Sequence, residues 1–352
     1  MVETRSRFAF LDSLRFVAAA LVVFQHLFEH RTGFVGETLV PLGPGVAGVA
    51  LFFFISGYVI PLSAGTQFAA LQFIVRRLFR IYPLFLSAIA LIFLLGATSV
   101  LPQWSFMSYA PAIQWLANLA LVQDFVGQEA FLGVSWTLVI ELIWYGMFAA
   151  ALMRFGDRAA SALDILLPLS LVAMAILSLV MDVRLPIGRP TMIYAAVIGF
   201  QCFRRAQGNL SSAALVRSVL IFAVVALATN YVSFGLFRHP HITLAQSLGP
   251  WTVGTIIFFT VLLLKPLRNA RWLNSGLIPA LGAMSYSIYL LHPVAIAAAE
   301  DYAPGNWRVP VAVGLTAVLS MVGYHIVEKP GIALGRKIAR WPGTITLEFA
   351  AS

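Results

Sequence analysis

Long apolar stretches separated by short polar segments recur along the whole chain. A helix needs about 20 mostly apolar residues to cross a bilayer, and these stretches reach or approach that length. The pattern predicts an all-α integral membrane protein that forms one domain, residues 1–352, with no appended extracellular domain. About ten transmembrane helices are expected, near residues 10–30, 45–63, 79–100, 133–153, 162–181, 187–203, 213–236, 248–265, 277–298 and 309–327.

One further apolar piece, 110–122, is too short to cross the membrane and contains Gln114 and Asn118. A stretch of this length is more often re-entrant or interfacial than spanning, so we expect a short helix of that kind here. The first stretch, 10–30, lacks a small-residue cleavage site after a short apolar core. We therefore expect it to be retained rather than removed as a signal peptide.

Composition excludes an ordinary soluble protein, because 60% of the residues are hydrophobic and only 11% are charged. Soluble domains carry about 25% charged residues. The single cysteine, Cys202, also excludes an intrachain disulfide. The outer loops must hold together without one.

The basic residues divide unequally between the two sides of the predicted membrane. Seventeen lie on the side of both termini: Arg5, Arg7, Arg76, Arg77, Arg80, Arg154, Arg158, Arg204, Arg205, Arg217, Lys265, Arg268, Arg271, Lys329, Arg336, Lys337 and Arg340. Five lie on the other side: Arg31, Arg184, Arg189, Arg238 and Arg308. Because basic residues collect in cytoplasmic loops, we expect cytoplasmic termini and a bacterial inner-membrane location. The net charge of +9 then needs no nucleic-acid partner.

The first predicted helix carries an arginine and a histidine on one face. Arg15 and His26 are eleven positions apart, and at about 100° per residue this is three turns plus roughly 20°. Both residues are costly inside a membrane unless they have partners, so the pair favours a functional site. The simpler alternative is that Arg15 extends to the lipid headgroups and a neighbour satisfies His26.

Two other ionisable residues are expected at the same membrane depth as His26, in the outer half of the bilayer. Glu141 lies about two turns into its helix, and His292 lies near the outer end of another. Histidine is the usual general base, and a carboxylate can orient it. The alternatives are that Glu141 makes only a structural ion pair or hydrogen bond, and that His292, which precedes Pro293, only caps its helix.

The inner half of the predicted membrane region carries guanidinium groups instead. Arg15 lies there, and Arg76, Arg77 and Arg80 form a cluster on the expected cytoplasmic surface. Guanidinium suits phosphate, although positive-inside bias and lipid phosphate binding would also explain the cluster. No clustered Cys/His set, GxSxG elbow or phosphate-binding loop occurs, so we expect no metal and no ATP-driven step.

Several short motifs follow one another in a characteristic order along the chain. They are Leu11-Asp12-Ser13-Leu14-Arg15 with His26, the run Phe52-Phe53-Phe54-Ile55-Ser56-Gly57-Tyr58, Arg77-x-x-Arg80-Ile81-Tyr82-Pro83, Ser135-Trp136-Thr137-Leu138 with Glu141, Ser285-Tyr286-Ser287-Ile288-Tyr289-Leu290-Leu291-His292-Pro293, and Glu328-Lys329-Pro330. In this order, over essentially the whole chain, they resemble acyltransferase family 3, a family of multi-pass membrane O-acyltransferases. Thr137 stands where that family usually has serine, which preserves a hydroxyl.

The resemblance implies transfer of an acyl group, with acetyl the expected one, from cytoplasmic acyl-CoA. The expected acceptor is a hydroxyl of an envelope or exported glycan or glycolipid. The implied site comprises catalytic His26 and Glu141, donor-binding Arg15, Arg76, Arg77 and Arg80, and supporting His292, Ser135, Trp136 and Tyr58.

The residues and the resemblance suggest one mechanism. His26, oriented by Glu141, deprotonates the acceptor hydroxyl, which attacks a thioester rising past Arg15. An alternative route passes the acyl group through a covalent His26 intermediate. An alternative function is a proton-coupled transporter or flippase of a glycolipid, with these residues as a proton relay. An inverted internal repeat would favour that function, and the sequence has none that we recognise.

Overall fold

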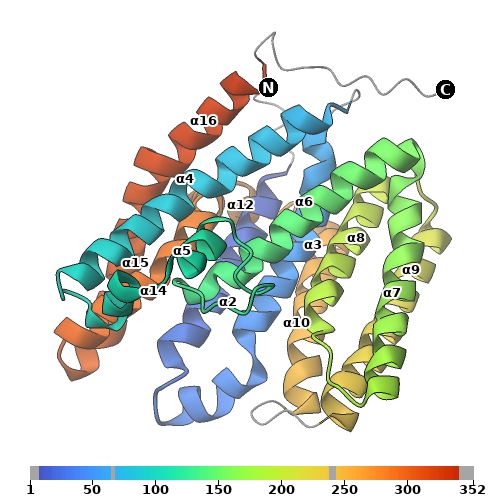
Figure 1. Cartoon of the computed structure of the whole chain (residues 1–352). Coiled ribbons are helices and arrows are strands. Elements are labelled where there is room, and N and C mark those ends of the chain that lie inside the picture. The colour runs from blue at the N-terminus through green and yellow to red at the C-terminus, as the bar shows by residue number, and fades with distance from the viewer. Residues whose placement is uncertain (1–7, 65–67, 238–242, 341–352) are drawn as a thin grey trace.

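The computed structural model describes residues 8–64, 68–237 and 243–340, and these residues form helices and loops without a β-strand (Figure 1). Arg5, Arg7 and Arg238 of the predicted charge pattern lie outside the described residues. The prediction of an all-α membrane protein is confirmed. Each predicted stretch coincides with a helix in the structure.

The long helices are α2 (Ala9–Phe28), α3 (Pro44–Ala64), α4 (Ala70–Ala97), α6 (Trp136–Phe155), α7 (Ala159–Met181), α8 (Gly188–Ala206), α9 (Ser212–Asn230), α10 (Leu244–Leu263), α14 (Ser285–Tyr302) and α15 (Arg308–Gly323). Short helices connect or extend them: η1 (Val35–Leu39), η2 (Val40–Leu42), η3 (Pro102–Tyr109), α5 (Ala112–Leu119), η4 (Gly133–Ser135), η5 (Gly156–Arg158), η6 (Tyr231–Leu236), α11 (Lys265–Arg268), α12 (Arg271–Asn274), α13 (Leu277–Ala283), η7 (Gly305–Trp307), η8 (Tyr324–Glu328) and α16 (Lys329–Ile338).

The predicted count of about ten spans is not confirmed. Seven helical stretches of the described chain are long and apolar enough to cross a membrane. The number is eight if Arg271–Ala283, which contains α12 and α13, forms one span with α14, which it meets at a 51° bend. Helices α6 and α7 count once because η5 joins them. Helix α8 does not qualify, and it contains Arg189, Arg204 and Arg205. Most of its residues are buried against protein, so it has less need of a lipid-compatible surface.

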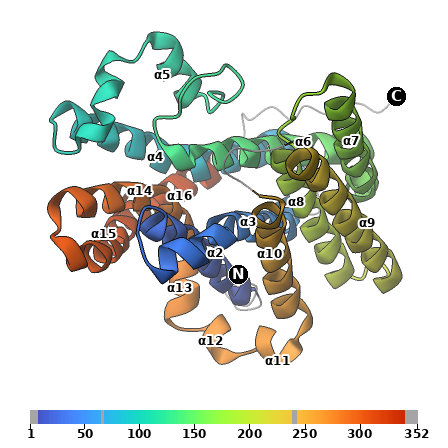
Figure 2. The ribbon, with the colours of Figure 1, turned by 90° about the horizontal axis from the view of Figure 1, so that it is seen from below.

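Helix α3 lies near the centre of the molecule, with α2, α8 and α10 around it (Figure 2). Its contact with α8 depends on glycine. A Cβ at Gly57 would lie 1.7 Å from the carbonyl oxygen of Ala196, and one at Gly199 would lie 2.1 Å from that of Phe54. Small residues let two membrane helices approach this closely. Gly57 is therefore a helix-packing residue.

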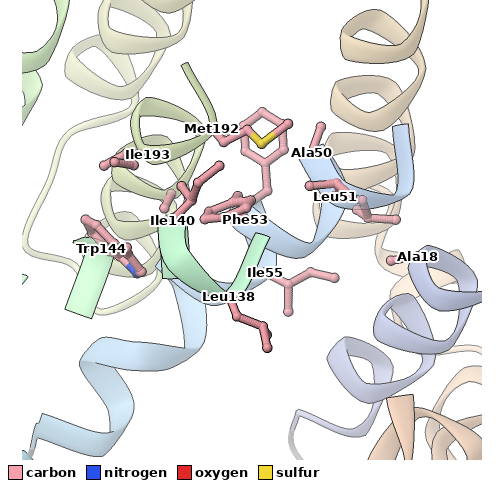
Figure 3. Packing of buried hydrophobic residues seen from close by; sticks show 14 of the residues in the cluster. Ala18, Ala50, Leu51, Phe53, Ile55, Leu138, Ile140, Trp144, Met192 and Ile193 are labelled. Atoms are coloured by element: carbon pink, nitrogen blue, oxygen red, sulfur yellow. The ribbon is translucent and has the colours of Figure 1, made fainter. Parts of the chain in front are cut away.

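The apolar core extends from this contact to the neighbouring helices. Phe53 of α3, Ile140 of α6 and Met192 of α8 are buried and lie together (Figure 3). The same three helices carry polar residues a few positions away, so the packing that forms the core also fixes the geometry of the site.

Helix α4 begins at Ala70 rather than near residue 79. Phe73, Ile81 and Leu84 are buried at helical spacing, and Arg77 lies on the same face as Phe73 because residues four apart are neighbours on a helix. Arg77 and Arg80 are half-buried on this helix and line an internal cavity rather than an open surface, whereas their place on the cytoplasmic side stays a prediction.

The short helix expected within 110–122 is present as α5, which has eight residues. At 1.5 Å per residue it is about 12 Å long, too short to cross a bilayer. It lies at the edge of the molecule (Figure 2), with the side chains of Ile113 and Leu116 exposed.

Candidate active site

A cavity of about 90 Å³ lies where α2, α3, α4, α6 and α14 meet. Its ionisable and hydroxyl-bearing lining residues are Arg15, Ser56, Arg77, Arg80, Thr137, Glu141, Tyr145, Ser285, Tyr286 and Tyr289. Apolar residues of α3, α4 and α6 complete the wall. The lining carries three guanidinium groups against one carboxylate, and this excess of positive charge suits an anionic ligand. We call this space the arginine cavity.

Arg15 reaches the arginine cavity from the first half of α2. Its Nη1 lies 3.0 Å from a carboxylate oxygen of Asp12, one helical turn earlier. The start of α2 is fixed by the hydroxyl of Ser13, which donates to the carbonyl of Leu273 at 2.7 Å. A Cβ at Gly282 of α13 would also collide with the backbone of Asp12. The close packing of α13 on α2 therefore positions Arg15.

Arg77 enters from α4 and is enclosed by aromatic rings. Its guanidinium carbon lies 5.3 Å from the ring centre of Phe73 and 5.4 Å from that of Tyr145. It donates to the hydroxyl of Ser63, but its buried Nε has no hydrogen-bond partner among the described residues. A buried donor without a partner is costly.

The two carboxylates nearest to Arg77 and Arg80 are held by hydroxyl groups. Glu141 accepts a hydrogen bond from Tyr145. Glu328, which is 1% exposed, accepts one from Ser287 at 2.6 Å and is the strongest electrostatic partner of Arg80. Hydroxyl donors stabilise the charged carboxylates in this buried setting.

His26 lies elsewhere, in a second and more open pocket lined also by His30, Arg31, Thr32, Glu300 and Arg308, among others. We call this space the outer pocket, since it lies beyond the C-terminal half of α2. Glu300 bridges Arg31 and Arg308 across it. The structure therefore places Arg15 and His26 on one helix as expected, but facing two different spaces.

The expected hydrogen bond between His26 and Glu141 is absent from the structure. The Nδ1 of His26 instead lies 3.0 Å from a carboxylate oxygen of Glu29, three residues later on α2. Residues with this spacing are neighbours on a helix surface. If Nδ1–H donates to Glu29, the Nε2 of His26 keeps its lone pair and can accept a proton. Glu29 thus takes the orienting position that the sequence suggested for Glu141.

His292 stacks on His26, with ring centres 5.2 Å apart and planes inclined by 27°. It is fully buried, its Nδ1 lies 3.2 Å from the carbonyl oxygen of Ile288, and its Nε2 has no partner among the described residues. Helix α14 continues to Tyr302. His292 therefore does not cap the end of a helix.

The remaining expected residues surround the site without lining the arginine cavity. Arg76 donates to the carbonyl of Ser63 at 3.3 Å. The buried hydroxyl of Ser135 accepts a hydrogen bond from Gln123 at 3.2 Å, and Trp136 begins α6. Tyr58 packs edge-on against Phe8 and Phe203. These residues have supporting positions rather than direct ones.

The sequence analysis assigned no role to Glu29, Tyr145, Tyr286, Tyr289 or Glu328. Two spacings hint at some of them. Tyr145 is four residues after Glu141, and Tyr286, Tyr289 and His292 are three apart, so each set shares a helix face. Glu328 had no such signal, because its partners come from other helices.

Comparisons with known proteins agree with the geometry. The acyltransferase family 3 model, described as an acyltransferase domain, matches residues 8–325. A putative membrane-bound transacylase, BcsY of Komagataeibacter xylinus, is 26% identical over 343 residues, which cover 92% of this chain and 82% of that protein. No solved structure matches the chain significantly. The chain therefore belongs to acyltransferase family 3, and the match supports a membrane acyltransferase.

Proposed function

We propose that this protein moves an acyl group, in the first instance acetyl, from cytoplasmic acyl-CoA to a hydroxyl of a sugar-containing acceptor in the envelope or in an exported glycan. One observation carries the proposal. Three half-buried arginines line one cavity, and His26, whose Nδ1 pairs with Glu29, lies in the neighbouring pocket.

The arginine cavity supports an anionic donor. Guanidinium groups bind phosphate through planar, paired hydrogen bonds, and acyl-CoA carries several phosphates. A cavity of about 90 Å³ has the volume of roughly three water molecules in the liquid. We therefore expect the cavity to widen when the donor binds, with Arg76 near the entrance as a further phosphate contact.

The outer pocket supports the acceptor. His26 would remove the proton of the acceptor hydroxyl through Nε2, while Glu29 holds Nδ1–H and stabilises the imidazolium. The hydroxyl oxygen then forms a bond to the thioester carbon, the carbon–sulfur bond breaks, and the proton passes to the departing thiolate. A covalent acyl group on His26 remains the alternative route.

The predicted orientation suits this division. With both termini in the cytoplasm of a bacterium, the donor enters from the cytoplasmic side and the acceptor from the outer side of the inner membrane. The related protein's description as a membrane-bound transacylase supports acyl transfer at a membrane.

Mass spectrometry of envelope glycans tests the proposal. Cells that produce the wild-type protein should contain O-acyl groups that are absent from cells lacking it. The His26→Ala variant should fail to restore them, whereas His325→Ala, which changes an exposed histidine outside both spaces, should restore them. Equal O-acylation with wild-type protein and with none would contradict the proposal.

A further inference from the structure

Helix α16 packs closely along α4 (Figure 1). A Cβ at Gly331 would lie 2.8 Å from a ring carbon of Pro83. A Cβ at Gly335 would lie 2.4 Å from the Cβ of Phe79. Residue numbers rise along α16 where they fall along α4, so the two helices run antiparallel. The buried Ala339 continues the line of the two glycines by one more turn, because residues four apart share a helix face.

This packing brings basic residues of the two helices together. Arg76 lies three residues before Phe79, on the face of α4 that meets α16. Arg340 directly follows Ala339 and is close enough to Arg76 for their charges to interact. Arg336 lies four residues before Arg340, on the same side of α16. We call Arg76, Arg336 and Arg340 the basic surface.

The basic surface has no acidic counterpart among the described residues. Neither α4 nor residues 329–340 contain an aspartate or a glutamate, and no ion pair between described residues involves the basic surface. Arg336 and Arg340 are exposed, and half-buried Arg76 donates to the carbonyl of Ser63. Positive-inside bias explains why basic residues gather on one side of a membrane, but it does not require like charges of two helices to meet. Such charges repel each other, and a bound anion relieves the repulsion.

The basic surface adjoins the arginine cavity along α4. Arg76 precedes Arg77 in the chain, and Arg77 and Arg80 line the cavity. The cavity of about 90 Å³ has the volume of roughly three water molecules, so it is too small for all the phosphates of acyl-CoA. The diphosphate of acyl-CoA is joined to the pantetheine arm that carries the thioester, whereas the ribose 3′-phosphate lies at the far end. We infer that the basic surface binds this ribose phosphate, while Arg77 and Arg80 bind the diphosphate.

This inference rests on the proposed function, and its test compares two ligands. Calorimetry measures the binding of coenzyme A and of 3′-dephospho-coenzyme A, which lacks only the ribose phosphate, to purified protein in detergent. The proteins are the wild type, Arg336→Ala/Arg340→Ala and the matched control Lys337→Ala. Lys337 carries the same charge on the same helix and is exposed. It lies two residues after Gly335, so at about 100° per residue it points away from α4.

We expect the wild type and Lys337→Ala to bind coenzyme A about tenfold more tightly than the dephospho ligand. This is the combined effect of two exposed ion pairs, each of which is weak alone. The double variant should bind both ligands equally, because removing either partner of a contact makes removal of the other silent. Arg336→Gln takes the place of the double variant if that protein fails to fold.

The outcomes separate the inference from the proposed function. A wild type that binds both ligands equally, or a double variant that keeps the full preference for coenzyme A, overturns the inference alone. Phosphatidylglycerol added to the micelles tests lipid as the other source of phosphate. If the double variant loses lipid binding but keeps its preference for coenzyme A, the surface is a lipid site and the inference is wrong. Absence of coenzyme A binding by the wild type would overturn the proposed function itself.

Discussion

The hydrogen bond between His26 and Glu29 gives a prediction about which residues act as one unit. We consider Glu29→Gln and Glu141→Gln, each made alone and together with His26→Ala. The structure pairs His26 with Glu29 at 3.0 Å and places Glu141 in a separate space with Arg77 and Arg80. Residues that share a contact couple, whereas separate residues act additively.

The expected effect of Glu29→Gln on the rate follows from the solvent exposure of the His26–Glu29 pair. The His26 and Glu29 side chains are 36% and 30% exposed. Exposed ion pairs contribute about 0.2–1 kcal/mol, and hydrogen bonds to charged groups about 1.5–3 kcal/mol. We take about 1 kcal/mol for this half-exposed pair, which corresponds to roughly a fivefold fall in rate for Glu29→Gln. His26→Ala removes the base and should lower the rate by about 10²-fold or more.

The assay is steady-state acyl transfer from acetyl-CoA, read as kcat/KM. In the His26→Ala protein, Glu29→Gln should cost almost nothing more, because the histidine that it orients is gone. Glu141→Gln should keep its full effect there, since it acts in the arginine cavity. The reasoning is refuted if Glu141→Gln becomes silent in the His26→Ala protein while Glu29→Gln still lowers the rate fivefold.

Three further predictions test the fold, the orientation and the arginine cavity. Gly57→Leu should destabilise the protein by about 1–3 kcal/mol or more through overpacking, because a Cβ there meets the Ala196 carbonyl. Gly146→Ala, where a Cβ would meet open space, should not lower thermal stability in detergent, since alanine is the better helix former. An equal loss of stability in both variants would contradict the packing. The orientation is tested with single cysteines in a Cys202→Ala background and an impermeant thiol reagent on intact cells. A cysteine in place of the exposed Val183 should react, and one in place of the exposed Leu71 should not. The reverse pattern would invert the orientation. Tyr145→Phe keeps the ring beside Arg77 but removes the hydrogen bond to Glu141. The free energy of unfolding should therefore fall by about 1–3 kcal/mol. No loss would show that Glu141 has another partner.

The sequence predicted the positions of the helices well because apolar stretches of spanning length are a strong local signal. It misplaced the start of α4, since Arg76, Arg77 and Arg80 interrupt the hydropathy and concealed the buried face that begins at Phe73. Only packing against other helices could reveal that Arg77 and Arg80 are half-buried and line a cavity.

The sequence predicted which residues belong to the candidate site better than it predicted which of them touch. Depth along the chain placed Arg15, Arg77 and Arg80 together in the inner half, and the structure joins them in one cavity, which Glu141 also lines. Depth alone also suggested that Glu141 meets His26. Which residues of different helices touch depends on helix rotation, and that rotation is set by close contacts such as Gly57 on Ala196 and Gly282 on Asp12. A single sequence carries no direct record of these contacts.

Calorimetric titration of the purified protein with coenzyme A tests the central claim most directly. The wild type should bind, and the Arg77→Ala/Arg80→Ala protein should bind much more weakly while remaining folded. The Arg77→Lys/Arg80→Lys protein should recover only part of the affinity, because lysine lacks the planar guanidinium fork. Equal affinity of the wild-type and double alanine proteins would contradict the assignment of the arginine cavity to the donor.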